Sequence, residues 1–255
     1  MPSMNSQNKR TDNSSVIIPI ETVLQILSAN NTVEGGDIPD HLIEEQIFYL
    51  NEAFRPAGFS FVLSEVVRTV NERWYHNLRS YTDIHDEVAT LRKGGNATLN
   101  IYTYGTDYYP GWSWGALPEE MAWTPQLDGI FLHRLLWRGA GDANWDLGGS
   151  LVHEAGHWFG LFHTASMSCE ESWDYVDDTP MELISDVIGG CDIGRDTCPD
   201  QPGLDPIHNW MGFSNDPCRN SFTPGQIQRM REQMAKFRQV VYPGIDVDKI
   251  PNDGE

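Results

Sequence analysis

The chain has 255 residues, of which 40% are hydrophobic and 11% aromatic, so it can bury a substantial core and is not globally disordered. Its 17 basic and 37 acidic residues give a net charge of −20 at pH 7. That balance argues against nucleic acid and anionic membranes as partners, because both bind basic faces. No stretch approaches the roughly 18 consecutive apolar residues of a membrane span.

Strands and helices are predicted to alternate along the chain. Residues 1–15 are polar and are expected to form a flexible arm. Ile43, Ile47 and Leu50 repeat at helical spacing and predict the first helix. The expected elements are a strand at 16–27, a helix at 40–54, a strand at 59–70, a short helix at 83–91, a strand at 98–104, a turn and edge strand at 108–114, a strand at 129–133, and a last helix that starts at 223–224.

The most specific pattern is HEAGHWFGLFH at residues 153–163, which places His153, Glu154, His157, Gly160 and His163 at fixed offsets. On a helix, His153 and His157 lie one turn apart on the same face, where two imidazoles can hold one zinc ion beside Glu154. The helix is expected to end at Gly160, because glycine adopts the left-handed conformation of such turns. His163 then follows on the returning chain as a third ligand. The spacing H-E-x-x-H-x-x-G-x-x-H is that of metzincin zinc peptidases.

This pattern predicts a catalytic zinc site, since three neutral imidazoles leave one zinc position for water. The metal would lower the pKa of that water toward about 7. Glu154 would act as general base, taking the proton during attack on a peptide carbonyl and passing it to the leaving amine. The expected activity is that of a zinc-dependent endopeptidase with one zinc ion per chain, acting as a monomer on protein or peptide substrates.

All four cysteines lie after the histidine motif, within residues 169–218. None forms a C-x-x-C pair, which argues against a second zinc site. An even number in a segment rich in Gly, Pro and Asp favours two disulfides and therefore an oxidising compartment. The first 15 residues contain no apolar signal-peptide core. A leader has been removed, the protein leaves by another route, or it stays inside; the cysteines favour a secreted protein.

Beyond the histidine motif, the chain resembles the pappalysin family of metzincin metalloendopeptidases, in particular its small secreted members from fungi and bacteria. The resemblance spans roughly residues 16–240 and includes LRKGG at 91–95, DYVDDTP at 174–180, GRDTCP at 194–199, PIHNWMGF at 206–213 and SFTPGQIQRM at 221–230. It implies an α/β (α+β) metzincin-like fold. The upper lobe would hold a twisted mixed sheet and two helices, including the zinc helix, and the lower lobe would be irregular and disulfide-linked, with a C-terminal helix.

The expected organisation is a single catalytic domain at residues 16–242, with the upper lobe at about 16–160 and the lower lobe at about 161–242, followed by an acidic tail at 243–255. The resemblance implies that Met211 belongs to a Met-turn, a tight turn beneath the zinc histidines. It also implies the disulfides Cys169–Cys198 and Cys191–Cys218, a pairing that the spacing alone leaves open.

Three further features follow from the resemblance. The stretch with Asp174, Asp177 and Asp178 resembles a loop that binds calcium in relatives, and an exposed acidic turn is an equally weighted alternative. Close relatives carry a tyrosine two residues after the Met-turn methionine, where its phenol stabilises the oxyanion, whereas this chain has Phe213. The segment that follows is expected to shape the pocket beyond the scissile bond, where Asp216 would favour a basic substrate residue.

Two other functions remain as alternatives. The first is a zinc-binding protein with impaired catalysis that acts as a recognition module or decoy. Phe213 favours this alternative, and the intact Glu154 argues against it. The second is a zinc hydrolase that acts on a non-peptide amide. No residue in the sequence supports this alternative directly.

Overall fold

The computed structural model describes residues 16–78, 83–105, 113–120, 123–141, 144–170, 173–184 and 189–251. The predicted arm at 1–15, residues 108–112 of the predicted turn and edge strand, and the end of the acidic tail lie outside these ranges. Within them, no helix is both long enough and apolar enough to cross a membrane.

The elements follow the predicted alternation. The strands are β1 (Ile18–Ser28), β2 (Phe59–Val70), β3 (Leu99–Tyr104), β4 (Ser113–Gly115), β5 (Ile130–His133), β6 (Ala165–Ser166) and β7 (Glu182–Leu183). The α-helices are α1 (Asp40–Phe54), α2 (Glu72–Asn77), α3 (Asp83–Ala89), α4 (Gly149–Trp158) and α5 (Pro224–Arg238). Short 3-10 turns occur at Arg55–Ala57, Pro125–Leu127, Arg134–Leu136 and Val247–Lys249.

Five strands form one mixed sheet in the order β2-β1-β3-β5-β4. The first four run parallel, and the short edge strand β4 pairs antiparallel with β5. Parallel strands require crossover connections, and helices lie in the connections from β1 to β2 and from β2 to β3. Because both faces of such a sheet are covered, β3 and β5 are buried at every position.

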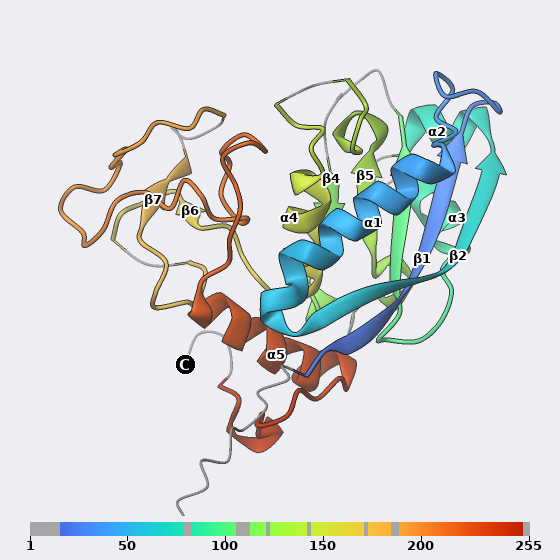
Figure 1. Cartoon of the computed structure of the whole chain (residues 1–255). Helices are drawn as coiled ribbons and strands as arrows, with labels where there is room; N and C mark the ends of the chain where they lie inside the picture. The colour runs from blue at the N-terminus through green and yellow to red at the C-terminus, as the bar shows by residue number, and fades with distance from the viewer. Residues whose placement is uncertain are drawn as a thin grey trace, which may run out of the picture.

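Alternating side chains divide the core into two layers. Leu99 and Ile101 of β3 join the cluster beneath α1 and α4, whereas Tyr102 and Tyr104 join the cluster that includes Val88 of α3. Figure 1 shows α1 and α4 side by side across the sheet, with α5 running below them. The pleat of the sheet therefore explains why the zinc-motif helix and the helices α2 and α3 lie on opposite faces.

The chain beyond α4 is mostly irregular. Its only described regular elements before α5 are β6 and β7, which pair in parallel as a two-stranded sheet. Figure 1 places this segment to one side of the main sheet, above α5. The helix α5 then begins with a capping box, in which Thr223 accepts from the Gln226 backbone N–H and the Gln226 side chain accepts from Thr223. The start predicted from Thr223 and Pro224 is confirmed.

The sequence pattern missed α2, β6 and β7, and it extended α3 two residues too far, to residue 91. The helix α2 is only one and a half turns long and carries no repeating apolar stripe. Its start could have been found, because Asn71 accepts a hydrogen bond from the Trp74 N–H as an ordinary N-cap. The strands β6 and β7 have two residues each, too few for any periodicity to show.

Candidate metal centre and active site

The helix α4 carries the histidine motif, and a residue far away in sequence fixes where it begins. Asp216 accepts hydrogen bonds from the backbone N–H groups of Leu147 and Gly149, each at 3.0 Å. Arg219 donates to the same carboxylate, and both side chains are buried. A carboxylate at a helix N-terminus satisfies free N–H groups and complements the helix dipole. These contacts occupy the Asp216 carboxylate inside the fold and argue against the expectation that it selects a basic substrate residue.

A glycine turn ends α4 and returns the chain toward it. Gly160 has φ +93°, and its N–H donates to His157 O at 2.8 Å, while the Leu161 N–H donates to Gly156 O at 2.9 Å. This pair of bonds is the usual closure of a helix whose last residue is left-handed. A residue with a β-carbon would be strained there, so the turn requires glycine. The returning chain brings His163 beside the helix.

The three motif histidines converge on one point. Their Nε2 atoms lie 3.2 Å apart for His153 and His157, 3.0 Å for His157 and His163, and 3.1 Å for His153 and His163. His153 Nδ1 lies 2.8 Å from Trp210 O, and His157 Nδ1 lies 2.7 Å from Leu161 O. A carbonyl oxygen can only accept, so these two Nδ1 atoms carry the proton, and each Nε2 directs its lone pair inward.

The electrostatics of this cluster favour a bound cation. Burial lowers the pKa of His157 to about 4 and the pKa of His163 to about 3, and it holds the pKa of His153 well below its ordinary value. The rings are therefore neutral, and lone pairs about 3 Å apart repel one another unless a cation lies between them. A tetrahedral ion about 2.0–2.1 Å from each nitrogen spaces the nitrogens about 3.3 Å apart, close to the observed geometry. The donor set therefore fits a metal ion of the zinc type.

Glu154 lies between His153 and His157 in sequence and is 5% exposed. Ser113 Oγ of the edge strand β4 donates a hydrogen bond to Glu154 Oε1. Burial raises the pKa of Glu154 to about 7, against the lowering effects of the Ser113 hydroxyl, the Arg219 charge and the Gly115 N–H. A carboxyl group with such a pKa can take up and release a proton near neutral pH.

Met211 is fully buried within a tight turn, in which the Gly212 N–H donates to Asn209 O. The Asn209 side chain accepts from the Met211 N–H at 2.9 Å and pairs with the Gln226 amide of α5. The residue before Met211 supplies the carbonyl that orients His153. The turn is thus tied both to the histidine cluster and to α5. The assignment of Met211 to a Met-turn stays a prediction.

Phe213 lies directly beside the histidine cluster. Its ring centroid is 4.6 Å from that of His163 and 6.1 Å from that of His153. The position that carries a phenol in close relatives therefore faces two of the three histidines, but here it offers them no hydroxyl.

Two of the three carboxylates that were predicted to bind calcium accept hydrogen bonds within the protein. Asp174 is buried and accepts hydrogen bonds from Thr179 Oγ1 and the Val176 N–H. Asp178 accepts from Thr223 Oγ1 and from the Gly225 N–H at the start of α5. Among the described residues, Asp174, Asp177 and Asp178 do not form a cluster of metal-binding groups. Hydrogen bonds within the protein thus explain the positions of Asp174 and Asp178 without a metal ion, and calcium binding stays a prediction.

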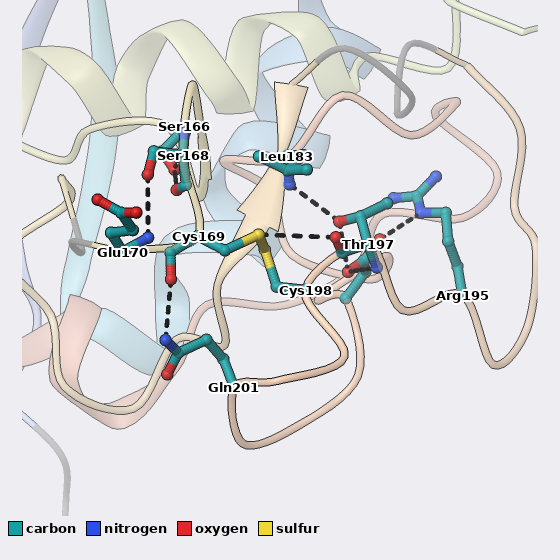
Figure 2. Close-up of a disulfide and its surroundings, with 10 residues drawn as sticks. Ser166, Ser168, Cys169, Glu170, Leu183, Arg195, Thr197, Cys198 and Gln201 are labelled. Carbon is teal, nitrogen blue, oxygen red and sulfur yellow. Dashed lines mark hydrogen bonds and ion pairs between the residues drawn. A yellow bond between two sulfur atoms is a disulfide. The ribbon is translucent and has the colours of Figure 1, made fainter.

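The structure contains two disulfides, Cys169–Cys198 and Cys191–Cys218, with Cα–Cα distances of 5.6 and 5.7 Å. They are the pairs that the resemblance implied. Figure 2 shows the first one, where Gln201 Nε2 donates to Cys169 O and the Leu183 N–H of β7 donates to Thr197 Oγ1. This cross-link therefore joins the loop after β6 to the loop after β7. His208 lies near the second disulfide. Cys191, His208 and Cys218 do not form a metal site, because the sulfurs of a disulfide are not available as thiolate ligands.

Pattern reading missed the supporting contacts of three residues, although it had singled out Asp216 for another role. The three residues are Ser113, which contacts Glu154; Asp216, which caps α4; and Arg229 of α5, whose Nε donates to Gly160 O at 2.8 Å and fixes the glycine turn. No local signal marks them, because each acts on an element far away in sequence. A polar residue in the short strand that precedes the helix was the one available hint for Ser113.

Comparisons with known proteins agree with this site. The peptidase M43 family model, described as pregnancy-associated plasma protein-A, matches residues 131–235. An extracellular metalloprotease of Verticillium alfalfae is 40% identical over 231 residues, covering 87% of this chain and 79% of the relative. An extracellular metalloprotease of Pyricularia oryzae is 38% identical over 229 residues, covering 87% of this chain and 76% of the relative.

The fold has a solved counterpart. Mature mirolysin of Tannerella forsythia, in complex with a cleaved peptide, superposes with a TM-score of 0.72 at 25% identity, covering 86% of this chain and 92% of mirolysin. Family match, relatives and fold all agree with the motif and the converging histidines. The chain therefore belongs to the pappalysin (peptidase M43) family of metzincins and is a metalloendopeptidase.

Proposed function

We propose that the chain is a secreted zinc endopeptidase in which His153, His157 and His163 hold the ion and Glu154 is the general base. The observation that carries the proposal is the convergence of three neutral Nε2 atoms within 3.0–3.2 Å of one another, next to a buried carboxyl group. Three imidazole ligands are typical of a catalytic zinc site, which keeps one position open. The extracellular relatives and the two disulfides support action outside the cell.

When bound, zinc polarises the substrate carbonyl and makes a water molecule more acidic. Glu154 then performs the proton transfers of peptide hydrolysis. Its carboxylate accepts the proton of the attacking water and delivers it to the nitrogen of the scissile bond, so that one water is consumed and a new carboxyl and a new amino terminus form. The raised pKa suits both steps, because the carboxyl group must accept a proton and then lose it again in each turnover.

The protein around the histidines keeps them ready to bind. Trp210 O and Leu161 O accept the Nδ1 protons of His153 and His157, so these rings need not reorient when the ion enters. Low histidine pKa values also reduce competition between protons and metal, and the site should retain zinc below pH 6.

The test replaces Glu154 with Gln, which keeps shape and burial but cannot accept the proton. Purified wild type and Glu154→Gln would be incubated with a mixture of unfolded polypeptides, with and without a zinc chelator. Mass spectrometry would map new termini and measure the metal content. We expect internal cleavage by the zinc-loaded wild type, and a loss of at least about 100-fold for Glu154→Gln with one zinc still bound. Glu232→Gln, a carboxylate change on α5, is the matched control and should cleave like wild type.

Each other outcome has a defined meaning. A Glu154→Gln variant with half the wild-type rate would rule out the general-base role. Wild-type protein that binds one zinc per chain but cuts nothing would favour the alternative, a recognition protein with impaired catalysis, for which Phe213 is the supporting feature. Unchanged zinc content after alanine replacement of each histidine would show that these histidines do not form the metal site.

A further inference from the structure

The edge strand β4 lies directly against the zinc-motif helix. Its three residues pair antiparallel with β5, through Ser113 with Leu132 and Gly115 with Ile130. A β-carbon on Gly115 would come within 2.3 Å of Glu154 O and 3.2 Å of His157 Cβ. Glycine at this position therefore lets the strand backbone approach α4 more closely than any other residue would allow.

This close approach brings Ser113 to the Glu154 carboxylate. Ser113 Oγ donates to Glu154 Oε1, across 41 positions of sequence. The serine is held at the end of a strand paired with the central sheet, while Glu154 comes from a buried helix. Both partners thus lie on elements of regular secondary structure, which position side chains more precisely than loops do.

We propose that Ser113 is a positioning residue, which holds Oε1 of Glu154 so that the carboxylate is oriented toward the reacting water. The inference rests on the proposed role of Glu154 as general base. The terminal torsion of a glutamate is broad and nearly two-fold. The Gly115 N–H also donates to this carboxylate, and with that donor alone we expect the carboxylate to sample orientations that do not accept the proton. A donor fixed to one oxygen selects one orientation before substrate arrives. Proton transfer requires that geometry, since a small misplacement of a reacting group is costly.

A merely structural hydroxyl would behave differently. Ser113 is only partly buried, so losing its hydroxyl should change the stability of the fold little. Loss of its hydrogen bond would act instead on the step in which Glu154 moves a proton. The effect should therefore appear in kcat, while KM, zinc content and melting temperature stay near those of wild type.

The experiment compares Ser113→Ala, Ser113→Thr and Ser60→Ala in the zinc-loaded protein. Steady-state rates would be measured on a fluorogenic peptide built around a cleavage site mapped for this protein. We expect Ser113→Ala to lose about tenfold in kcat with KM within about twofold, because the base remains but is no longer aligned. Ser113→Thr keeps a hydroxyl on a residue that suits a strand, and should recover most of the rate.

Ser60→Ala is the matched control. Ser60 is a partly buried serine of β2, the strand at the opposite edge of the sheet from β4. Loss of its hydroxyl should leave kcat within about twofold of wild type, because this position lies on a strand away from Glu154.

A Glu154→Asp background tests whether Ser113 acts through Glu154. The carboxylate is one methylene shorter there and moves away from the serine, so Ser113→Ala should cost less than about twofold in that background. Wild-type kcat in Ser113→Ala, or a Ser113→Thr variant as slow as the alanine variant, would overturn the positioning role. An inactive Glu154→Gln beside a fully active Ser113→Ala would reject this inference alone. An active Glu154→Gln would reject the proposed function itself.

Discussion

Arg238, the last residue of α5, is a buried cation that ties this helix to the end of the zinc-motif helix. Its guanidinium donates to both oxygens of Asp128, at 2.9 and 3.0 Å. It also donates to Trp158 O at 3.1 Å and to Asn96 O at 3.0 Å, and it lies 3.7 Å over the Trp158 ring. Trp158 is the last residue of α4. We therefore predict that Arg238→Met destabilises the protein although it leaves the active site untouched.

The expected loss of stability depends on which hydrogen bonds and ion pairs remain in each variant. Without Arg238, Asp128 still accepts from Arg92 at 2.9 Å and from Trp158 Nε1 at 3.0 Å, so its charge is not left unpaired. Breaking a buried ion pair usually costs 3–5 kcal/mol, and the remaining partners place Arg238→Met near the low end, about 3 kcal/mol. Asp128→Asn instead leaves the buried Arg238 and the partly buried Arg92 facing a neutral amide, and should cost about 5 kcal/mol.

Thermal and urea unfolding of the zinc-loaded variants would measure how much stability Arg238→Met and Asp128→Asn each lose. At about 2–4 °C per kcal/mol for a chain of this size, Tm should fall by about 6–12 °C in Arg238→Met and by about 10–20 °C in Asp128→Asn. Arg55→Met, which removes an exposed pair with Glu52, is the control and should change stability by less than about 0.5 kcal/mol. The reasoning would be refuted by an Arg238→Met variant within about 2 °C of wild type, or by one less stable than Asp128→Asn.

Two further predictions concern His85 and Phe213. His85 is 2% exposed, and its ring has no hydrogen-bond partner among the described residues. Burial lowers its pKa, and the nearby Asp86 charge opposes this lowering only in part. The unfolded chain then binds the extra proton, so the free energy of unfolding falls as pH drops below about 6.5, by at most about 1.4 kcal/mol per pH unit. His85→Phe should remove this component in urea titrations between pH 5 and 7, and an unchanged pH slope would contradict the assignment. Phe213→Tyr restores a hydroxyl beside His163 and should raise kcat about tenfold at similar KM, whereas an unchanged kcat would show that this chain does not use that donor.

The elements that could be predicted from sequence are those with a repeating local signal. The helix α1 was found with both bounds correct, because its apolar side chains recur at helical spacing and Pro56 and Gly58 follow it. The strands β3 and β5 differ from their predicted ranges by one residue. The helix α2 and the two-residue strands of the irregular segment were missed, because a signal that depends on repetition needs several repeats.

The candidate site divides in the same way. Spacing alone predicted that His153 and His157 share one face of a helix and that the chain turns at Gly160, because helix geometry and the left-handed turn are local properties. Four cysteines permit three pairings, so the disulfides depended on resemblance rather than on spacing. Asp216 shows the limit of that approach, since a residue expected in a substrate pocket proved to cap α4.

The sequence by itself determined the metal-binding motif, the order of the main elements and the family. Only the tertiary structure decided what surrounds and aligns the motif. Ser113 meets Glu154 across 41 positions, Trp210 O meets His153 across 57, and Asp128 meets Arg238 across 110. Helix and strand periodicity extend over a few residues, whereas these contacts depend on how the sheet, α4 and α5 pack together. The candidate metal ligands could thus be read from local spacing, and the groups that orient them could not.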